Sequence, residues 1–158
     1  MIIIGIDPGS KGAIAVMSDG NIQALYPFPV TAAGLDIVLK EYPGAWVFAE
    51  APASQRFVVY VRKAFLYCGQ IRGICCAYNL PLYEVPSKEW KKTVLAGKPY
   101  EKNKAISVEY ATCKYPDWSA SILDRKTFTD NTGPADAICL AEYGFLKLKG
   151  EVIYEGKK

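Results

Sequence analysis

Three carboxylates stand where a folded chain could bring them together. Asp7 follows the apolar residues 2–6 and precedes Pro-Gly, Glu50 closes a second apolar run, and Asp136 follows a Thr-Gly-Pro sequence. The chain contains no histidine, which excludes Ser-His-Asp and Cys-His catalysis and histidine-based zinc hydrolysis. Carboxylates that meet without histidine point to a divalent cation such as Mg²⁺, which prefers oxygen ligands.

A pair of such cations predicts a definite reaction. Two ions about 4 Å apart can catalyse phosphodiester hydrolysis. One ion would help to activate water for in-line attack, and the other would stabilise the leaving oxygen.

Each carboxylate also has an ordinary structural explanation. Asp7 could be a turn aspartate, and Glu50 could be the solvated end of a strand. If Gly133 is the N-cap of the last helix and Pro134 its first residue, Asp136 occupies the third position, where a carboxylate favours the helix dipole. The three carboxylates together favour a metal site over three separate explanations.

The elements that must position these residues follow from the hydrophobic pattern. Strands are predicted at residues 1–7, 13–18, 21–29, 45–52 and 81–86, and helices at 34–42, 58–78, 102–113 and 135–148, with a short helix starting at 87. Asp19-Gly20 predicts a two-residue hairpin, so the first three strands should form an antiparallel meander. Residues 117–131 show no clear period. The order predicts an α/β fold, with a mixed five-stranded sheet flanked by helices on both faces.

This arrangement would bring the acids together. If the strands that end at Asp7 and Glu50 are parallel neighbours, their carboxyl ends meet at the sheet edge where α/β folds bind ligands. The start of the last helix could direct Asp136 to the same edge.

Length and composition indicate one globular domain. The chain has 158 residues, of which 51% are hydrophobic, so we expect one domain at residues 1–150 and a short charged tail at 151–158. The five cysteines form no C-x-x-C pair, which favours reduced and mostly buried thiols. No signal peptide and no membrane span are recognised, so we expect a cytoplasmic protein.

The charge of the chain is uneven. The net charge is +3, with −2 in residues 1–60 and +5 in the remainder. The basic part holds a cluster of six lysines: Lys88, Lys91, Lys92, Lys98, Lys102 and Lys104. With Trp90 and Tyr100 among them, they could bind phosphates and stack on bases. The alternative is a solvated basic helix pair with Trp90 as a core anchor. Arg62 and Lys63 could add phosphate contacts, or their side chains could simply extend from a helix into solvent.

Four sequence blocks resemble the RuvC family of Holliday-junction resolvases, which has the RNase H-like fold. They read, in order, IGIDPGSKGAIAV, FAEAP, GQIRGICCAYNLPLYEVPSKEWKKTVLAG and ADAICLAEYG. Together they span residues 2–144, and the last block is closest to the phage branch. The resemblance implies a homodimeric, Mg²⁺-dependent endonuclease of DNA recombination (Mn²⁺ is possible) that cuts four-way junctions symmetrically.

The resemblance also assigns metal ligands. Asp7 and Glu50 match the first two metal ligands, and Asp136 matches the last. The family has a further acid three or four residues before the last one, where this chain has Gly133 and Thr132. Asp130 is the nearest carboxylate, and it is either a displaced fourth ligand or a loop acid.

The DNA-binding residues implied by the resemblance lie in the basic part of the chain. Lys91 falls on a family lysine, with Lys92 beside it. Lys104, or else Lys102, falls on the lysine that lies near the scissile phosphate and neutralises its charge. Phe57 would match an aromatic residue that stacks on junction bases.

Two rival functions remain open from the sequence. One is another RNase H-like nuclease that acts on branched DNA or RNA–DNA hybrids with the same acids. The other is a junction-binding protein with weak or no catalysis, which the missing family acid supports.

The helix at 58–78 is apolar around much of its circumference, so we expect it to be buried and to contribute to a dimer interface.

Overall fold

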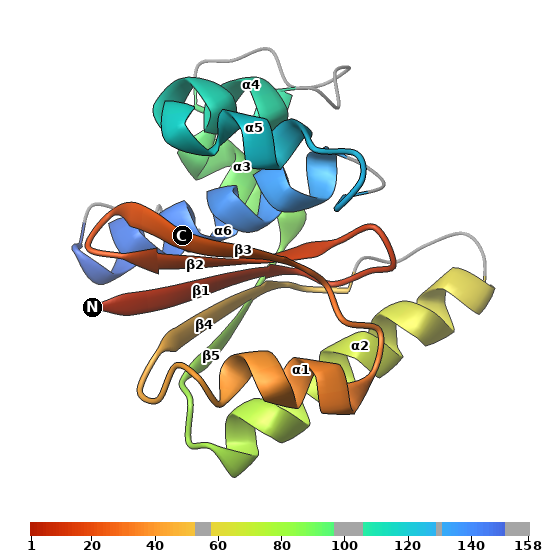
Figure 1. Ribbon diagram of the computed structural model, residues 1–158. Coiled ribbons are helices and arrows are strands. Elements are labelled where there is room, and N and C mark those ends of the chain that lie inside the picture. Colours follow the sequence, from red (N-terminus) through yellow and green to blue (C-terminus); the bar gives the residue numbers. More distant parts are fainter. Residues whose placement is uncertain (53–57, 97–105, 129–130, 151–158) are drawn as a thin grey trace, which may run out of the picture.

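A mixed five-stranded sheet forms the centre of the molecule (Figure 1). The computed structural model describes residues 1–52, 58–96, 106–128 and 131–150. The strands are β1 (Ile2–Asp7), β2 (Ala13–Ser18), β3 (Asn21–Pro27), β4 (Trp46–Glu50) and β5 (Leu82–Val85), in the spatial order β3-β2-β1-β4-β5. The meander β1-β2-β3 is antiparallel, whereas β4 is parallel to both β1 and β5. The predicted sheet is confirmed.

Helices cover both faces of this sheet (Figure 1). One face carries α1 (Ala32–Leu39) and α2 (Val58–Ala77). The other carries α3 (Ser87–Val94), α4 (Ile106–Lys114), α5 (Ser119–Leu123) and α6 (Thr132–Leu148), with a 3₁₀ turn at Pro116–Trp118. Of the helix predicted at 102–113, residues 106–113 are helical, and the first four lie outside the described residues.

The 3₁₀ turn and α5 were not predicted from the sequence. A five-residue helix is too short to show a period of 3.6 residues. Ile122 is fully buried and anchors α5 in the core, while Leu123 beside it is 48% exposed. Tertiary packing rather than local pattern therefore holds this segment.

The hairpin between β2 and β3 has the predicted turn. Asp19 and Gly20 have φ values of 50° and 85°. A two-residue type I′ turn requires this left-handed backbone at both central positions, and Asp-Gly adopts it readily. The turn explains why β2 and β3, which follow each other in the chain, pair as antiparallel neighbours.

Two glycines allow α6 to lie directly against the sheet. A Cβ at Gly5 would stand 2.1 Å from the carbonyl oxygen of Ala137 in α6. A Cβ at Gly133 would stand 2.0 Å from the carbonyl oxygen of Lys11 in the turn after β1. Real Cβ atoms do not approach other atoms so closely, so glycine is required at both positions. The start of α6 is thus held beside the carboxyl end of β1.

A partly buried ion pair joins α4 to α6. Glu142 is 2% exposed, and its carboxylate accepts hydrogen bonds from Lys114 Nζ at 2.6 Å and from the Tyr115 hydroxyl. Burial together with the Glu142 carboxylate raises the pKa of Tyr115, so its hydroxyl remains a donor. These bonds hold α4 against α6 on that face of the sheet.

Helix α2 is two-sided rather than buried all round. Cys68, Ile71 and Cys75 are buried against the sheet, whereas Phe65 and Leu66 are 54% and 57% exposed. The expectation of full burial is wrong for the outer face, because α2 is the outermost layer and no further element packs on it within the described residues. The outer face therefore exposes apolar side chains beside the basic residues Arg62, Lys63 and Arg72.

The cysteines are free thiols, as expected, and three of the five are buried. In the part of the chain that the structure describes, no helix combines the length and the hydrophobicity that crossing a membrane requires.

Candidate metal and nucleic-acid site

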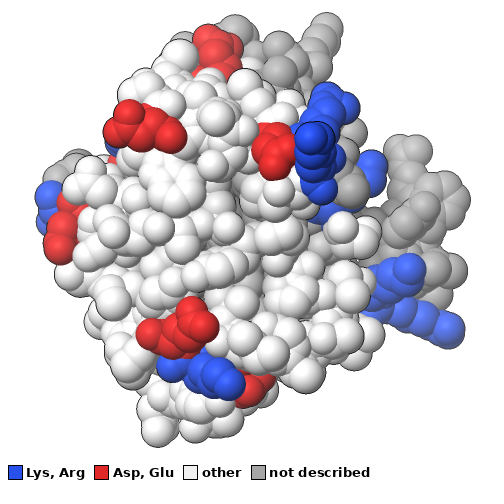
Figure 2. Space-filling model, viewed as in Figure 1, with Lys and Arg blue, Asp and Glu red and all other residues white. Residues whose placement is uncertain are grey.

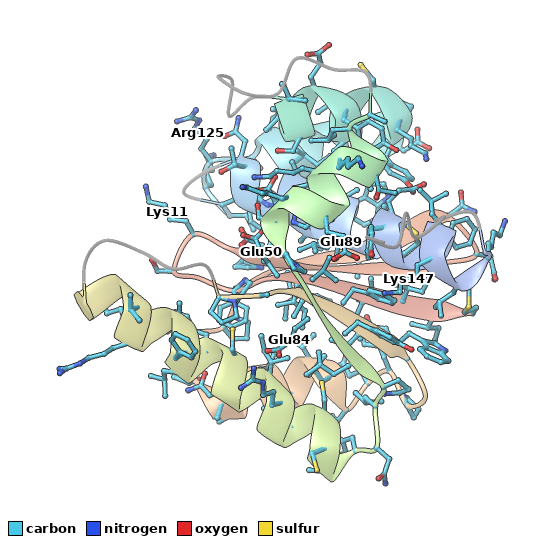
Figure 3. The ribbon with its side chains drawn as sticks, turned by 180° about the vertical axis from the view of Figure 1, so that it is seen from behind. Lys11, Glu50, Glu84, Glu89, Arg125 and Lys147 are labelled. Atoms are coloured by element: carbon cyan, nitrogen blue, oxygen red, sulfur yellow. The ribbon has the colours of Figure 1, made fainter. Side chains whose placement is uncertain are left out.

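The parallel strands β1 and β4 place Asp7 and Glu50 next to each other. Ile6 is paired with Ala49, so the following residue of each strand is a carboxylate at the same edge. Since side chains alternate along a strand, both carboxylates share the face on which Phe48 packs against α6. Figure 3 shows Glu50 at this edge, close to α3. The predicted convergence of the two strand ends is confirmed.

Glu50 is held by α3. Its Oε2 atom accepts a hydrogen bond of 3.0 Å from the indole Nε1 of Trp90. Burial raises the pKa of Glu50, and hydrogen bonds from Trp90 and Ser87 and the charge of Lys91 oppose that rise. The carboxylate is thus partly desolvated, and its donors favour the ionised form that can bind a cation.

Asp136 lies farther into α6 than predicted. The N-cap is Asn131, not Gly133, and the first turn contains no acidic residue. The prediction that Asp136 occupies the third helical position is wrong: that position is held by Pro134, and Asp136 is fifth. Proline is tolerated there because the first four N–H groups of a helix have no intrahelical partner. The explanation of Asp136 as a first-turn residue that favours the helix dipole therefore fails.

The donors of this edge fit a hard divalent cation. Among the described residues, no three Asp, Glu or Cys side chains stand close enough to hold a metal by themselves. Mg²⁺, however, is usually bound by one or two carboxylates together with water and substrate phosphate. Asp7 and Glu50 provide that pair. Asp136 lies on the helix that faces them, and Asp130 lies outside the described residues.

The basic residues near this edge come from several elements. Lys91 is half-buried, with Nζ 5.0 Å from the centroid of the Trp90 ring, and Lys92 is exposed. Arg62 is exposed on α2. Lys102, Lys104 and Phe57, together with Lys98 and Tyr100, lie outside the described residues.

Trp90 is a core residue, not a stacking platform. Its side chain is fully buried, so the first of the two readings from the sequence, stacking on DNA bases, is wrong for this residue. Its hydrogen bond to Glu50 was not predicted, because residues 40 positions apart give no local signal.

The sequence reasoning missed two further basic side chains near this edge. Lys11 and Arg125 both project on the side of the molecule where β1 and β4 end (Figure 3). In Figure 2 Lys and Arg gather on this same margin, whereas the centre of the visible face carries few charges. Lys11 belongs to the turn directly after Asp7. This closeness in the sequence is the one signal that could have indicated its place.

Comparison with known proteins defines the fold. No protein-family model matches the chain, and no curated protein sequence matches it. Among solved structures, Thermus thermophilus RuvC in complex with a Holliday junction substrate is similar, with a TM-score of 0.64 at 16% identity. A second Thermus thermophilus RuvC structure gives a TM-score of 0.57 at 19% identity. In both cases 95% of this chain and 97% of the other are covered. The chain therefore has a RuvC-like fold of the RNase H-like class.

Proposed function

We propose that this chain is a divalent-metal-dependent endonuclease that resolves four-way DNA junctions by paired nicks. One observation carries the proposal: Asp7 and Glu50 end adjacent parallel strands in the fold of a protein that has been solved on a Holliday junction. The fold supports the substrate class, and the pair of carboxylates supports hydrolysis. The proposed setting is DNA recombination in the cytoplasm of a bacterial or phage-infected cell.

In the proposed mechanism, Asp7 and Glu50 hold the metal. Mg²⁺, or Mn²⁺ in its place, would supply stabilisation of charge on the phosphodiester and activation of water when bound. Asp136 is the proposed third ligand and Asp130 the fourth. The hydrogen bond that Glu50 accepts from Trp90 favours its ionised form, and Lys104 is proposed to neutralise the scissile phosphate.

Basic residues around this edge are proposed to bind the junction arms. Lys91 and Lys92 belong to α3, directly beside Glu50. Lys11 and Arg125 extend the same margin. The remaining proposed DNA contacts are Arg62, Lys102, Lys104 and Phe57.

The substrate class is tested by a panel of DNAs. With Mg²⁺ and equal concentrations, we expect a fixed four-way junction to be cut at least about tenfold faster than a matched duplex or RNA–DNA hybrid. Preferential cutting of the hybrid would contradict the junction proposal and favour the other RNase H-like nuclease activity. Asp130→Asn in the same assay tests whether this residue replaces the missing family acid.

A junction-binding protein with little catalysis is the second candidate. The described residues contain no three-ligand cluster, and Thr132 and Gly133 stand where the family has an acid. This candidate predicts tight junction binding with or without Mg²⁺, and no cleavage.

A homodimer formed through α2 is proposed to place two sites on one junction. The outer face of α2 exposes Phe65 and Leu66, and nothing stands within 4 Å of a Cβ at Gly69 or Gly73. Such a face allows two helices to approach closely, and a two-fold dimer suits two symmetric cuts.

For Leu66→Asp we therefore expect a monomer. The substitution removes an apolar contact, and the new carboxylate would have to be desolvated in the interface. Sedimentation velocity should show the wild type as a dimer and the variant as a folded monomer, with paired nicking converted to single nicks. Ile37→Asp, an equally exposed apolar residue on α1, is the control that should stay dimeric. A wild type that is monomeric at micromolar concentration would contradict the dimer.

A further inference from the structure

The side chain of Trp90 connects the helix layer to one of the proposed metal ligands. Its surface is fully buried, and its Nε1 donates to Oε2 of Glu50 over 3.0 Å. The indole N–H is a donor only, and it has a single hydrogen to give. That hydrogen is directed at a carboxylate rather than at a main-chain carbonyl.

The position of the indole is fixed by its neighbours. Trp90 belongs to the hydrophobic core between the sheet and α6, where close packing restricts its rotation. The preceding residue, Glu89, accepts a hydrogen bond from the hydroxyl of Tyr143 in α6. Figure 3 shows Glu50 and Glu89 beneath the same helix, α3. Helix α3, which carries Trp90, is thus hydrogen-bonded to α6. This contact helps to fix the direction in which the N–H of Trp90 points toward Glu50.

The contact leaves Glu50 able to bind a cation. A carboxylate has about four lone-pair sites on its two oxygens. Trp90 occupies one of these sites, on Oε2. A glutamate has three rotatable bonds, so a free Glu50 would lose conformational freedom each time it bound a metal. The bond from Trp90 removes part of that freedom before the metal arrives.

We infer that Trp90 is a positioning residue for the metal site: its buried N–H holds Oε2 of Glu50 and so orients the carboxylate toward the cation. This inference rests on the proposed function, since it takes Glu50 as a metal ligand. Hydrogen-bonding partners of metal ligands typically change metal affinity by 10–100-fold. The competing explanation is that Glu50 merely satisfies the N–H of a core tryptophan.

The experiment measures Mn²⁺ binding to the DNA-free protein by calorimetry and by the EPR signal of free Mn²⁺. In Trp90→Phe the N–H is lost while an aromatic core residue is kept. A second variant carries 3-benzothienylalanine at position 90, which has the shape of tryptophan with sulfur in place of N–H. The matched control is Tyr143→Phe, which removes the hydrogen bond from α6 to Glu89 of α3 but keeps the bond from Trp90 to Glu50. Glu50→Gln is the reference for loss of the ligand.

We expect both changes at position 90 to weaken Mn²⁺ binding by about tenfold or more, and Tyr143→Phe to change it by less than twofold. Unchanged affinity in the benzothienyl protein, with binding still lost in Glu50→Gln, would overturn the inference and leave the proposed function intact. If Glu50→Gln binds Mn²⁺ like the wild type, the proposed function fails in its choice of ligand, and this inference fails with it. If Trp90→Phe does not fold, the isosteric variant decides the question.

Discussion

Glu50→Gln is expected to give a protein that is more stable than the wild type and inactive. Burial raises the pKa of Glu50, which means that the folded chain bears a cost for ionising this carboxylate. Glutamine has the same shape, can accept the hydrogen bond from Trp90, and carries no charge. At pH 7 in EDTA we expect the free energy of unfolding to rise by about 1 kcal/mol, or about 2–4 °C in Tm for a chain of this size.

The sign of the effect follows from the two protonation states. Below the ordinary carboxylate pKa of 4.5, Glu50 is protonated in both the folded and the unfolded chain, and no cost arises. As the pH rises through the raised folded pKa, the folded protein must ionise Glu50, and stability is lost relative to glutamine. The advantage of Glu50→Gln should therefore be present at pH 7 and disappear near pH 4.

Activity should change in the opposite direction. Loss of a metal ligand removes several kcal/mol of charge stabilisation, so we expect junction cleavage to fall by about 10³-fold or more. Mg²⁺ should raise the Tm of the wild type but not that of the variant, because a cation that binds the folded state stabilises it.

Glu84→Gln is the matched control for Glu50→Gln. Glu84 lies on the neighbouring strand β5 and is paired with Arg72 at 2.6 Å, so its replacement should give no gain in stability and no loss of cleavage. A Glu50→Gln protein that is less stable than the wild type at pH 7 would contradict the burial argument. One that cleaves normally would remove Glu50 from the site.

Gly5→Ala is expected to have the largest effect on stability. Its new Cβ would lie 2.1 Å from the carbonyl oxygen of Ala137 and 2.4 Å from the backbone nitrogen of Ala141. Both atoms are backbone atoms of α6, so no side chain can turn away and the helix itself must move. Overpacking of this kind costs typically 1–3 kcal/mol and occasionally more. Because the new Cβ would collide with backbone atoms, we expect the free energy of unfolding to fall by about 3 kcal/mol or more, measured by urea unfolding.

The displacement of α6 would also affect the site. Because α6 carries Asp136, a shift of the helix away from β1 increases its separation from Asp7, and cleavage should fall even at temperatures where Gly5→Ala is folded. Gly9→Ala is the control: the nearest atom to its Cβ would be 4.0 Å away, and we expect its stability to change by less than about 1 kcal/mol. Equal stability of the two variants would refute the close contact between α6 and β1.

The sequence was sufficient to predict the parts of the fold that rest on local pattern. The apolar runs that end in Asp7 and Glu50 and the Asp19-Gly20 turn lead to the mixed sheet, and this order places the two acids together. What could not be predicted depends on tertiary packing. The bond from Trp90 to Glu50 joins distant residues, and α5 is held by the burial of Ile122.

The placement of Asp136 shows a different limit. The Gly-Pro pair indicated where a helix should begin, but the helix starts one residue earlier, at Thr132, and Gly133 packs against the carbonyl of Lys11. The family resemblance named the right fold from four short blocks. It also implied four acidic metal ligands, but no three acidic side chains among the described residues lie close enough to hold a metal.

The most direct test of the central claim compares cutting with binding in Asp7→Asn. Wild type and variant are incubated with a fixed four-way junction in Mg²⁺, and the nicked strands are mapped on sequencing gels; binding is measured in parallel with Ca²⁺. We predict symmetric paired nicks by the wild type, no nicks by Asp7→Asn, and equal binding by both. Binding by the wild type without nicks in Mg²⁺ or Mn²⁺, or cleavage that survives in Asp7→Asn, would contradict the proposal that Asp7 and Glu50 form the catalytic metal site.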